Sequence, residues 1–364
     1  MTILTVDLDA IAANWRHLAE RHAGPTAAVV KADAYGLGAA PVGARLHAEG
    51  ARHFFVAYPE EGLALRPHVG RAMVAILNGF FPDMAGLYVA HGLAPVLGTP
   101  ADIAAWAALG RRLGRQLPAL LHIDTGMNRL GLSARELDTL AADPAHLAGI
   151  DVLFAMTHLA NAELADDPRN AAQSARMAAA CARLPRMARS VANSSGIFLG
   201  EDMRSDLARP GAALYGINPT PAAESPMRPV LRLTARVLQL RDIAAGEPVG
   251  YNAIWTARRP TRVATVSAGY ADGYHRALSV NTTADPARTA FAFFDGGRLP
   301  LIGRVSMDLT TFDATDHPGV VQGSELELIG PNVPPDTVAA WAGTNGYEIL
   351  TSLKPRHGRV YATL

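Results

Sequence analysis

Short apolar runs alternate with helix-like stretches from Ala27 to about Tyr215, and this alternation constrains the fold more than any other feature of the chain. Strands and helices repeated in this way are typical of parallel βα units. The intervening stretches, such as ADIAAWAALGRRLG and NAAQSARMAAACARL, carry apolar residues at helical spacing. The candidate strands are AAVVK, FFVA, MVAIL, PVLG, ALLHID, VLFAMTH, RSVAN and the segment around AALYG. Eight such units predict an α/β fold, a (β/α)8 barrel of the TIM type.

The pattern changes after NPTPAAESPMRP, a stretch from Asn218 to Pro229 that is rich in Pro, Ser and Ala and has no period. Such a stretch is typical of a connection between domains. The segments beyond it that read as antiparallel strands are LRLTARVLQL, TRVATVSAGY, LPLIGRVSM and ELELIG, and DTVAAWAG and NGYEILTSL read as helices. We therefore expect a barrel over residues 1–225 and a smaller, mostly β domain over residues 226–364.

Composition argues against several classes of function. The 33 Lys and Arg residues balance 33 Asp and Glu residues, and no basic cluster favours nucleic acid or an anionic membrane surface. Asp7 and Asp9 stand where an export signal would need an apolar core, and no run is long and apolar enough to span a bilayer. Cys181 is the only cysteine, which excludes an intrachain disulfide and favours a cytoplasmic location. The 12 His residues show no metal-ligand spacing, so no metal site is predicted.

Polar residues stand at the ends of five predicted strands. They are Lys31, Asp124, His158, Asn193 and Arg209. In a parallel barrel the loops after the strands form one shared pocket, so residues at these ends are candidates for chemistry. Lys31 is the most informative, because a lysine at the mouth of a buried strand is costly unless its amine is used. Such an amine can lose its proton and attack an aldehyde, whereas the alternative is a solvated lysine at a strand end.

Eight segments of the chain resemble, in order, those of the bacterial alanine racemases, enzymes of fold-type III that use pyridoxal 5′-phosphate. The segments are VVKADAYGLG, HIDTGMNRLG, THLANAE, ANSSG, RPGAALYG, VGYNAIWTA, SAGYADGY and GRVSMDL. They extend over nearly the whole chain. The resemblance implies an isomerase that interconverts L-alanine and D-alanine, either for cell-wall peptidoglycan or for alanine catabolism. It also implies a pyridoxal-phosphate-binding barrel and a homodimer with shared active sites.

The resemblance further implies two acid/base groups. Lys31 would hold the cofactor through a Schiff base and then act as one base, and Tyr251 of the second domain would act as the other. Inverting a stereocentre by removing and returning a proton is easiest with one group on each side. In such dimers Tyr251 and Met307 complete the neighbouring subunit's barrel. Without the resemblance, Tyr251 is better interpreted as a loop aromatic beside Trp255.

Other residues take cofactor and substrate roles by the same resemblance. Arg209 would donate to the pyridine nitrogen and leave it unprotonated, which favours racemisation. With His158, it would lower the pKa of Tyr251, which is about 10 for a free phenol. The phosphate would accept hydrogen bonds from hydroxyls and from N–H groups at loop-to-helix starts. The cofactor-binding set is Lys31, Tyr35, His158, Asn193, Ser194 (or Ser195), Arg209, Gly211 and Ala212, and the substrate set is Arg129, Met307 with its neighbour Asp308, and Tyr270 at the entrance.

Three positions differ from the commonest form of this family. Leu37 stands where many members have His, a change we expect to be mild. His122 stands where well-known members carry a carbamylated lysine that orients the arginine matching Arg129. We therefore expect a bound anion such as chloride, another acceptor, or a different position of Arg129. A tyrosine near the phosphate is absent around Lys354 and Pro355, which predicts a looser pocket and leaves the strictness of alanine specificity open.

Two other classes of function stay open. One is another enzyme on the same scaffold, either a racemase of broader specificity or a decarboxylase, and Arg209 argues against the decarboxylase. The other is a non-catalytic pyridoxal-phosphate carrier built from the barrel alone. The presence of VGYNAIWTA in a second domain argues against a carrier, because a carrier needs no base on the far face.

Overall fold

The computed structural model describes residues 2–281 and 289–364, and the chain divides into two compact units. The barrel unit is Ile11–Arg228, and the β unit is Met1–Ala10 with Pro229–Leu364. The first ten residues belong to the β unit because β1 (Thr2–Val6) pairs with β9 (Leu231–Ile243) and β17 (Gly358–Tyr361). The domain boundary predicted after residue 225 places these ten residues in the barrel and therefore separates β1 from its partner strands.

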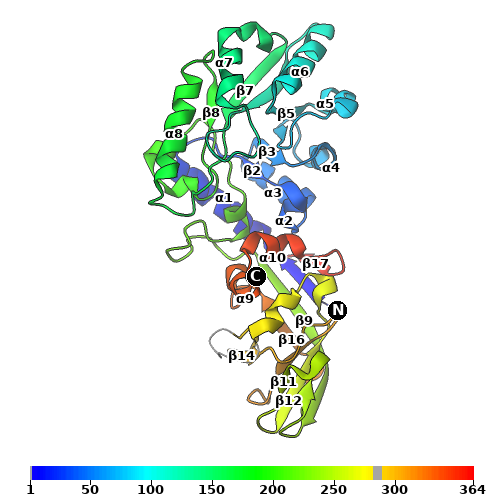
Figure 1. Ribbon diagram of the computed structural model, residues 1–364. Helices are drawn as coiled ribbons and strands as arrows, with labels where there is room; N and C mark the ends of the chain where they lie inside the picture. The colour runs from blue at the N-terminus through cyan, green and yellow to red at the C-terminus, as the bar shows by residue number, and fades with distance from the viewer. Residues whose placement is uncertain (1, 282–288) are drawn as a thin grey trace. The chain divides into compact units, whose positions relative to one another are not determined.

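Seven parallel strands form the curled sheet of the barrel unit, and they lie side by side in chain order (Figure 1). The strands are β2 (Ala28–Val29), β3 (His53–Val56), β4 (Met73–Ile76), β5 (Leu93–Leu97), β6 (Leu117–His122), β7 (Ile150–Met156) and β8 (Ala188–Ser190). They are short and mostly apolar because helices cover their outer face. Seven of the eight predicted strands are therefore confirmed.

The prediction of an eighth strand at AALYG is wrong, because Ala212–Tyr215 forms a 3-10 helix. The preceding segment, residues 207–210, takes the eighth place instead. Its backbone bonds β8 on one side, through Leu207 N–H to Arg189 O at 3.2 Å, and the β2 segment on the other, through Val29 N–H to Pro210 O at 3.1 Å. This segment closes the ring, and the proline at its end ends the pairing because it lacks an N–H.

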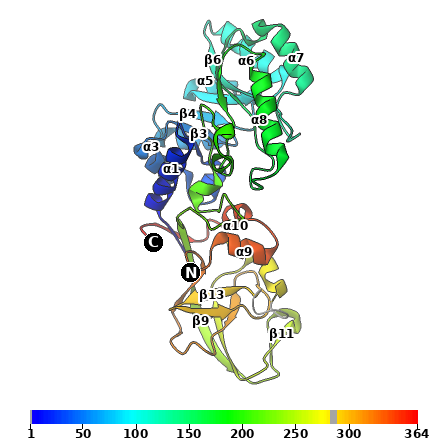
Figure 2. The same ribbon diagram turned by 90° about the vertical axis from the view of Figure 1, so that its left-hand side faces the viewer.

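Helices follow the strands on the outside of the sheet (Figure 2). They are α1 (Leu8–His22), α2 (Lys31–Tyr35), α3 (Ala39–Glu49), α4 (Pro59–Leu65), α5 (Ala85–His91), α6 (Pro100–Arg112), α7 (Ala134–Ala142) and α8 (Pro168–Cys181). Proline at the first helical position and a capping side chain mark the starts of α6 and α8, where Thr99 and Asp167 accept backbone N–H groups. These two helices correspond to the predicted Ala-rich helices.

The β unit contains an eight-stranded sheet in the order β14-β13-β16-β9-β1-β17, with β12 paired to β9 and to β15. Its remaining elements are β10 (Pro248–Val249), β11 (Trp255–Thr256), β12 (Thr261–Val266), β13 (Phe291–Phe294), β14 (Gly297–Pro300), β15 (Thr310–Asp313), β16 (Glu325–Ile329), α9 (Pro335–Ala342) and α10 (Gly346–Ser352). All of its pairings but β1 with β17 are antiparallel, as the alternating pattern predicts.

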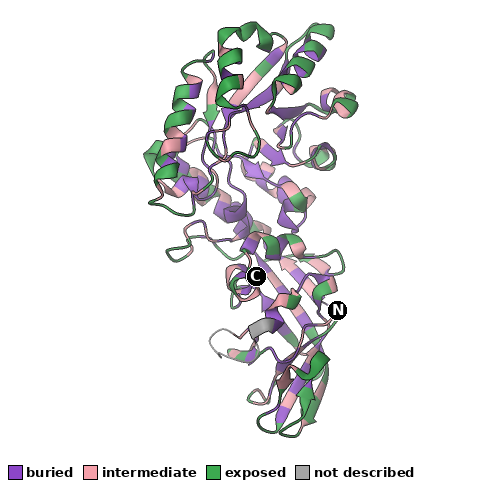
Figure 3. Ribbon diagram, in the orientation of Figure 1, coloured by how far each residue is buried: buried purple, intermediate pink, exposed green. Residues whose placement is uncertain are grey.

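Buried residues line the inner strands of both units, and exposed residues gather on the outer faces of the helices (Figure 3). In β5 every residue is buried, whereas in the first half of β9 buried residues alternate with half-buried or exposed ones. This difference is expected between a strand covered on both faces and one with a solvated face. None of the described helices is long and apolar enough to cross a membrane.

Candidate active site

The predicted strand-end residues follow the C-terminal ends of the parallel strands. Lys31 comes directly after the β2 region, and His158 and Asn193 follow β7 and β8. Asp124 follows β6, and Arg209 lies in the closing segment. The βα loops at this edge of a barrel form a shared pocket, so these positions are those expected of an active site.

Cationic and imidazole side chains gather at this edge. The charges of Arg209, Arg129 and Lys31 all act on His158, and those of Arg209 and Arg129 also act on His122. Arg209 is buried, and its guanidinium donates to the Ser190 hydroxyl and to the Thr157 carbonyl. The site therefore carries an excess of positive charge, and it is suited to an anionic ligand.

Burial and like charge act together on the protons of this cluster. Burial lowers the pKa of His158 to about 3, and the charge of Arg209 acts in the same direction. Burial and Arg209 likewise lower the pKa of His122 to about 4. Burial, followed by the charge of Arg129, lowers the pKa of the Lys31 amine, against the opposing effect of Glu61. Both imidazoles are therefore neutral near pH 7, and the lysine is easier to deprotonate than a solvated one.

Four side chains of the cluster make no hydrogen bond to any residue that the structure describes. They are Lys31, His122, Arg129 and His158. His122 is buried, and Lys31 and His158 are half-buried. Arg129 is exposed, so the polar atoms of the cluster are available to a ligand. The cluster can therefore offer several hydrogen bonds to one ligand.

A second feature of the site is a narrow cradle at Gly211. A Cβ atom at this position would lie 2.6 Å from the Tyr35 hydroxyl, so only glycine fits. The Gly211 N–H donates to Ser194 Oγ at 3.0 Å, and the Ala213 N–H donates to the same oxygen at 3.2 Å. Ser194 therefore keeps its hydroxyl proton for another acceptor. The structure brings together Tyr35, Ser194 and the Gly211–Ala212 backbone, the expected phosphate donors, although the Gly211 N–H already donates to Ser194 Oγ.

The backbone after Lys31 is unusual. Ala32, Asp33, Ala34 and Tyr35 have φ of 53°, 54°, 52° and 55°, which places four consecutive non-glycine residues in the left-handed region. Each such residue costs roughly 1–2 kcal/mol relative to the right-handed conformation. Strain of this kind is retained where the surrounding structure enforces it, and it concentrates at functional sites.

One residue that holds this turn was not predicted from the sequence. The Glu61 carboxylate accepts the Ala32 N–H at 2.7 Å, next to Lys31. The signal available for Glu61 was the PEE sequence after the FFVA strand, which is typical of a helix start rather than of a site.

Two predicted site residues have local structural roles in this structure. One Asp124 carboxylate oxygen accepts the N–H groups of Gly126, Met127 and Asn128, so Asp124 shapes the loop that carries Arg129. Asn193 Oδ1 accepts the Gly196 N–H at 2.8 Å and caps the following turn. Ser195, the alternative to Ser194, is buried at the start of the same turn, and its hydroxyl has no hydrogen bond to a described residue.

The remaining predicted residues belong to the β unit. Tyr251 is 68% exposed and lines a cavity of about 460 Å³ together with Gly250, Thr265, Arg304, Ser306, Leu309 and Thr311. Met307 is 54% exposed, and its N–H has no hydrogen-bond acceptor among the described residues. Tyr270 is 41% exposed, and its N–H donates to the Ser306 carbonyl at 3.0 Å. Tyr251, Tyr270 and Met307 thus form an exposed set of side chains on the β unit.

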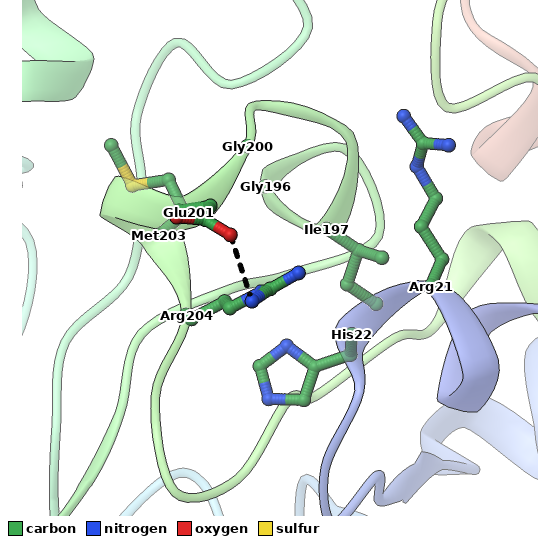
Figure 4. A pocket seen from close by; sticks show the side chains of 8 residues that line it. All are labelled: Arg21, His22, Gly196, Ile197, Gly200, Glu201, Met203 and Arg204. Atoms are coloured by element: carbon green, nitrogen blue, oxygen red, sulfur yellow. Dashed lines mark ion pairs between the residues drawn. The ribbon is translucent and has the colours of Figure 1, made fainter.

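A different cavity of about 230 Å³ lies in the barrel unit and contains none of the predicted residues (Figure 4). Its charged lining groups are largely paired. Glu201 forms an ion pair with Arg204 at 3.0 Å, and His22 Nε2 contacts the Ser205 carbonyl at 2.8 Å. The Arg21 guanidinium stacks on Phe198 at 4.4 Å. This cavity offers no group suited to the chemistry of the Lys31 cluster.

Comparisons with known proteins agree with the geometry. The family model described as "Alanine racemase, N-terminal domain" matches residues 6–219, and the one described as "Alanine racemase, C-terminal domain" matches residues 230–361. The alanine racemase of Acidiphilium cryptum is 52% identical over 98% of both chains. That of Methylobacterium nodulans is 49% identical over 98% of this chain and 95% of its own.

Solved structures show the same fold. The crystal structure of alanine racemase from Bartonella henselae, with covalently bound pyridoxal phosphate, has a TM-score of 0.93 and 41% identity over 99% of both chains. The biosynthetic alanine racemase of Pseudomonas aeruginosa has a TM-score of 0.89 and 35% identity over 100% of this chain and 99% of its own. The chain belongs to the alanine racemase family.

Proposed function

We propose that this protein interconverts L-alanine and D-alanine with pyridoxal 5′-phosphate bound at Lys31. The observation that carries the proposal is the Lys31 amine at the mouth of β2, within a cluster of Arg129, Arg209 and two neutral imidazoles. Burial and positive neighbours favour the neutral amine, which is the form that reacts with an aldehyde. The family membership of the chain supports the same substrate and cofactor.

The residues present fit this cofactor. Its phosphate matches the Tyr35 hydroxyl, the Ser194 hydroxyl and the close backbone approach that Gly211 allows. Arg209 is buried and fixed by Ser190 and Thr157, so it would offer a positive charge to the pyridine nitrogen. When bound, the cofactor withdraws electrons from the Cα–H bond of the substrate. Arg209 moderates this withdrawal, which favours return of the proton to Cα.

Two residues of the chain would move the proton. Lys31 would take it from Cα on one face or return it there, and Tyr251 would do the same on the opposite face. A phenol needs its pKa lowered by roughly two to three units, about 3–4 kcal/mol, to act as a base near neutrality. His158 is neutral, because its pKa is about 3, so the cationic contribution falls to Arg209 rather than to both residues. His158 would then act as a neutral hydrogen-bonding link.

We propose that the protein is a homodimer in which each β unit completes the site of a second copy. The exposure of Tyr251 and Met307 on the β unit supports this arrangement. The Met307 N–H also supports it, because this group has no hydrogen-bond acceptor among the described residues. In this proposal Arg129 and the Met307 N–H bind the substrate carboxylate, and Tyr270 lines the entrance. The reaction would take place in the cytoplasm, in agreement with a single cysteine, Cys181.

The direct test is incubation of the purified protein with L-alanine, followed by assay of D-alanine with a D-specific oxidase. A panel of other amino acids distinguishes strict from broad specificity. Borohydride reduction followed by peptide mass spectrometry should place the cofactor on Lys31. Labelling of another residue, or of none, would overturn the proposal.

Replacing Tyr251 with Phe tests the second base. The variant should keep the absorbance of the bound cofactor yet lose most turnover, because the phenylalanine ring cannot carry a proton. Equal loss of cofactor and turnover would assign Tyr251 a structural role. Retained turnover would exclude Tyr251 as a base.

A further inference from the structure

The segment after Lys31 holds a conformation that its own sequence does not favour. Residues 32–35 lie in the left-handed region, and none of them is glycine. Backbone bonds close the turn, among them those from Gly36 N–H to Ala32 O and from Gly38 N–H to Asp33 O, both at 2.8 Å. Backbone bonds of this kind are available to right-handed turns as well. They do not explain why this segment is left-handed.

One contact from outside the segment fixes the peptide plane at which the turn begins. Glu61 Oε1 accepts the Ala32 N–H at 2.7 Å. The other carboxylate oxygen accepts the N–H groups of Ala57 at 2.6 Å and Tyr58 at 3.2 Å. Glu61 therefore links the loop after β2 to the loop after β3. Capping of α4 accounts for the bond to Tyr58, but it does not account for the bond to Ala32.

The bond to Ala32 acts directly on Lys31. The Ala32 N–H belongs to the peptide plane that also contains the Lys31 carbonyl, and this plane is rigid. Fixing the N–H fixes the rotation about the Lys31 Cα–C bond, and with it the direction in which the lysine side chain leaves the backbone. Glu61 is also the acidic group whose charge acts on the Lys31 amine, against Arg129 and burial.

We propose that Glu61 is a positioning residue for Lys31: its carboxylate fixes the peptide plane between Lys31 and Ala32, at the start of the left-handed turn 32–35, and thereby aims the Lys31 amine. This inference rests on the proposed function, because the direction of Lys31 matters only if its amine holds the cofactor. Glu61 touches neither cofactor nor substrate in this role. It acts through the peptide plane between Lys31 and Ala32.

The test compares Glu61→Gln with Glu60→Gln in the full-length protein. Glutamine keeps the length of Glu61 but offers a single acceptor oxygen, so it cannot serve both loops. Glu60 precedes it on the same helix, is exposed, and makes no hydrogen bond to the described residues of either loop, so Glu60→Gln removes an equal charge as a control.

Hydrogen exchange of the cofactor-free protein is the first readout. Glu61→Gln should raise exchange in the peptide covering residues 31–38, while the peptides of β5 and β6 keep their protection. The pH dependence of acetylation at Lys31 should also shift to lower pH, because a negative charge near the amine is removed. Glu60→Gln should change neither measurement.

Kinetics of the holoenzyme are the second readout. Misaiming a reacting group lowers kcat by about 10- to 100-fold, and KM for alanine should change little because Glu61 does not contact the substrate. Adding Ala32→Gly to Glu61→Gln should restore part of kcat, since glycine adopts the left-handed conformation without a steric cost. A residue needed only for overall folding would show no such rescue.

The outcomes separate this inference from the proposed function. If Glu61→Gln matches Glu60→Gln in exchange and kcat, or raises exchange in all peptides alike, the positioning role is overturned while Lys31 keeps its own role. If Lys31→Ala retains turnover and borohydride labelling, the proposed function itself is refuted, whatever Glu61 does. Local exchange with reduced kcat and rescue by Ala32→Gly would support both.

Discussion

Replacing Gly211 with Ala tests the cradle proposed to receive the phosphate. The added Cβ would lie 2.6 Å from the Tyr35 hydroxyl, 3.3 Å from Tyr35 Cζ and 3.4 Å from Val29 Cβ. Tyr35 cannot easily withdraw, because it is buried and packs on Tyr215 with ring centroids 4.8 Å apart. Tyr215 is held in turn by its hydroxyl, which donates to the Val29 carbonyl at 2.9 Å.

The magnitude follows from these distances. Forcing a methyl group into a packed site of this kind costs about 1–3 kcal/mol in the free energy of unfolding. In a Tyr35→Phe background the oxygen at 2.6 Å is gone, and the closest remaining atoms lie at 3.3 and 3.4 Å. A shift of a few tenths of an ångström relieves these contacts. We therefore expect Gly211→Ala to cost less than about 1 kcal/mol in that background, a coupling of about 1–2 kcal/mol.

The assay is chemical denaturation of the cofactor-free wild-type protein, the two single variants and the double variant. Gly86→Ala is the matched control, since nothing lies within 4 Å of its added Cβ. Gly86 is exposed in α5 (Ala85–His91), so alanine there should be neutral or stabilise by about 1 kcal/mol. If Gly211→Ala costs the same with and without the Tyr35 hydroxyl, the steric account of the cradle is wrong.

Other predictions concern protons, anions and loops. The pKa values of His122 and His158 are about 4 and about 3 in the folded protein, against 6.5 for an ordinary histidine. The unfolded chain therefore binds more protons between these values, so the free energy of unfolding should fall as pH drops below about 6.5. Chemical denaturation at several pH values checks this dependence, and His122→Asn serves as the comparison. Bicarbonate depletion should leave activity unchanged, because His122 cannot be carbamylated as lysine can; a reversible loss would contradict this. Arg356 bridges Asp308, next to Met307, and Asp272, whose neighbour Ala271 donates its N–H to the Met307 carbonyl, so Arg356→Met should raise KM for alanine more than it lowers kcat. Lys354→Met, a neighbouring exposed cation, should leave both constants near wild type, and equal effects of the two variants would refute the bridge.

Much of the barrel could be predicted from the sequence because its strands are short apolar runs punctuated by polar residues. The strand ends made Lys31, His158 and Arg209 candidates, since a polar residue directly after a buried run is visible in the letters alone. The same rule also selected Asp124, whose carboxylate accepts three N–H groups of its own loop. A carboxylate at a strand end and a carboxylate that closes a turn look alike in sequence.

The eighth strand shows a different limit. AALYG is as apolar as the true strands, yet it follows Pro210 and Gly211, and it folds as a 3-10 helix. The residues that pair are the preceding ones, including Arg209, which no hydrophobic pattern would select. Their pairing is dictated by the gap left between β8 and β2 when the sheet curls. That gap is a property of the whole barrel, so no local window of sequence contains it.

The left-handed turn after Lys31 depends on a residue that is distant in the sequence. Nothing in ADAY requires positive φ, and a sequence without glycine predicts the right-handed region instead. The four residues cost roughly 1–2 kcal/mol each, so compensating contacts must hold them. Glu61 supplies one of these contacts from the next βα loop. The direction of the proposed reactive amine is therefore set by a residue that becomes its neighbour only after β2 and β3 have paired in parallel.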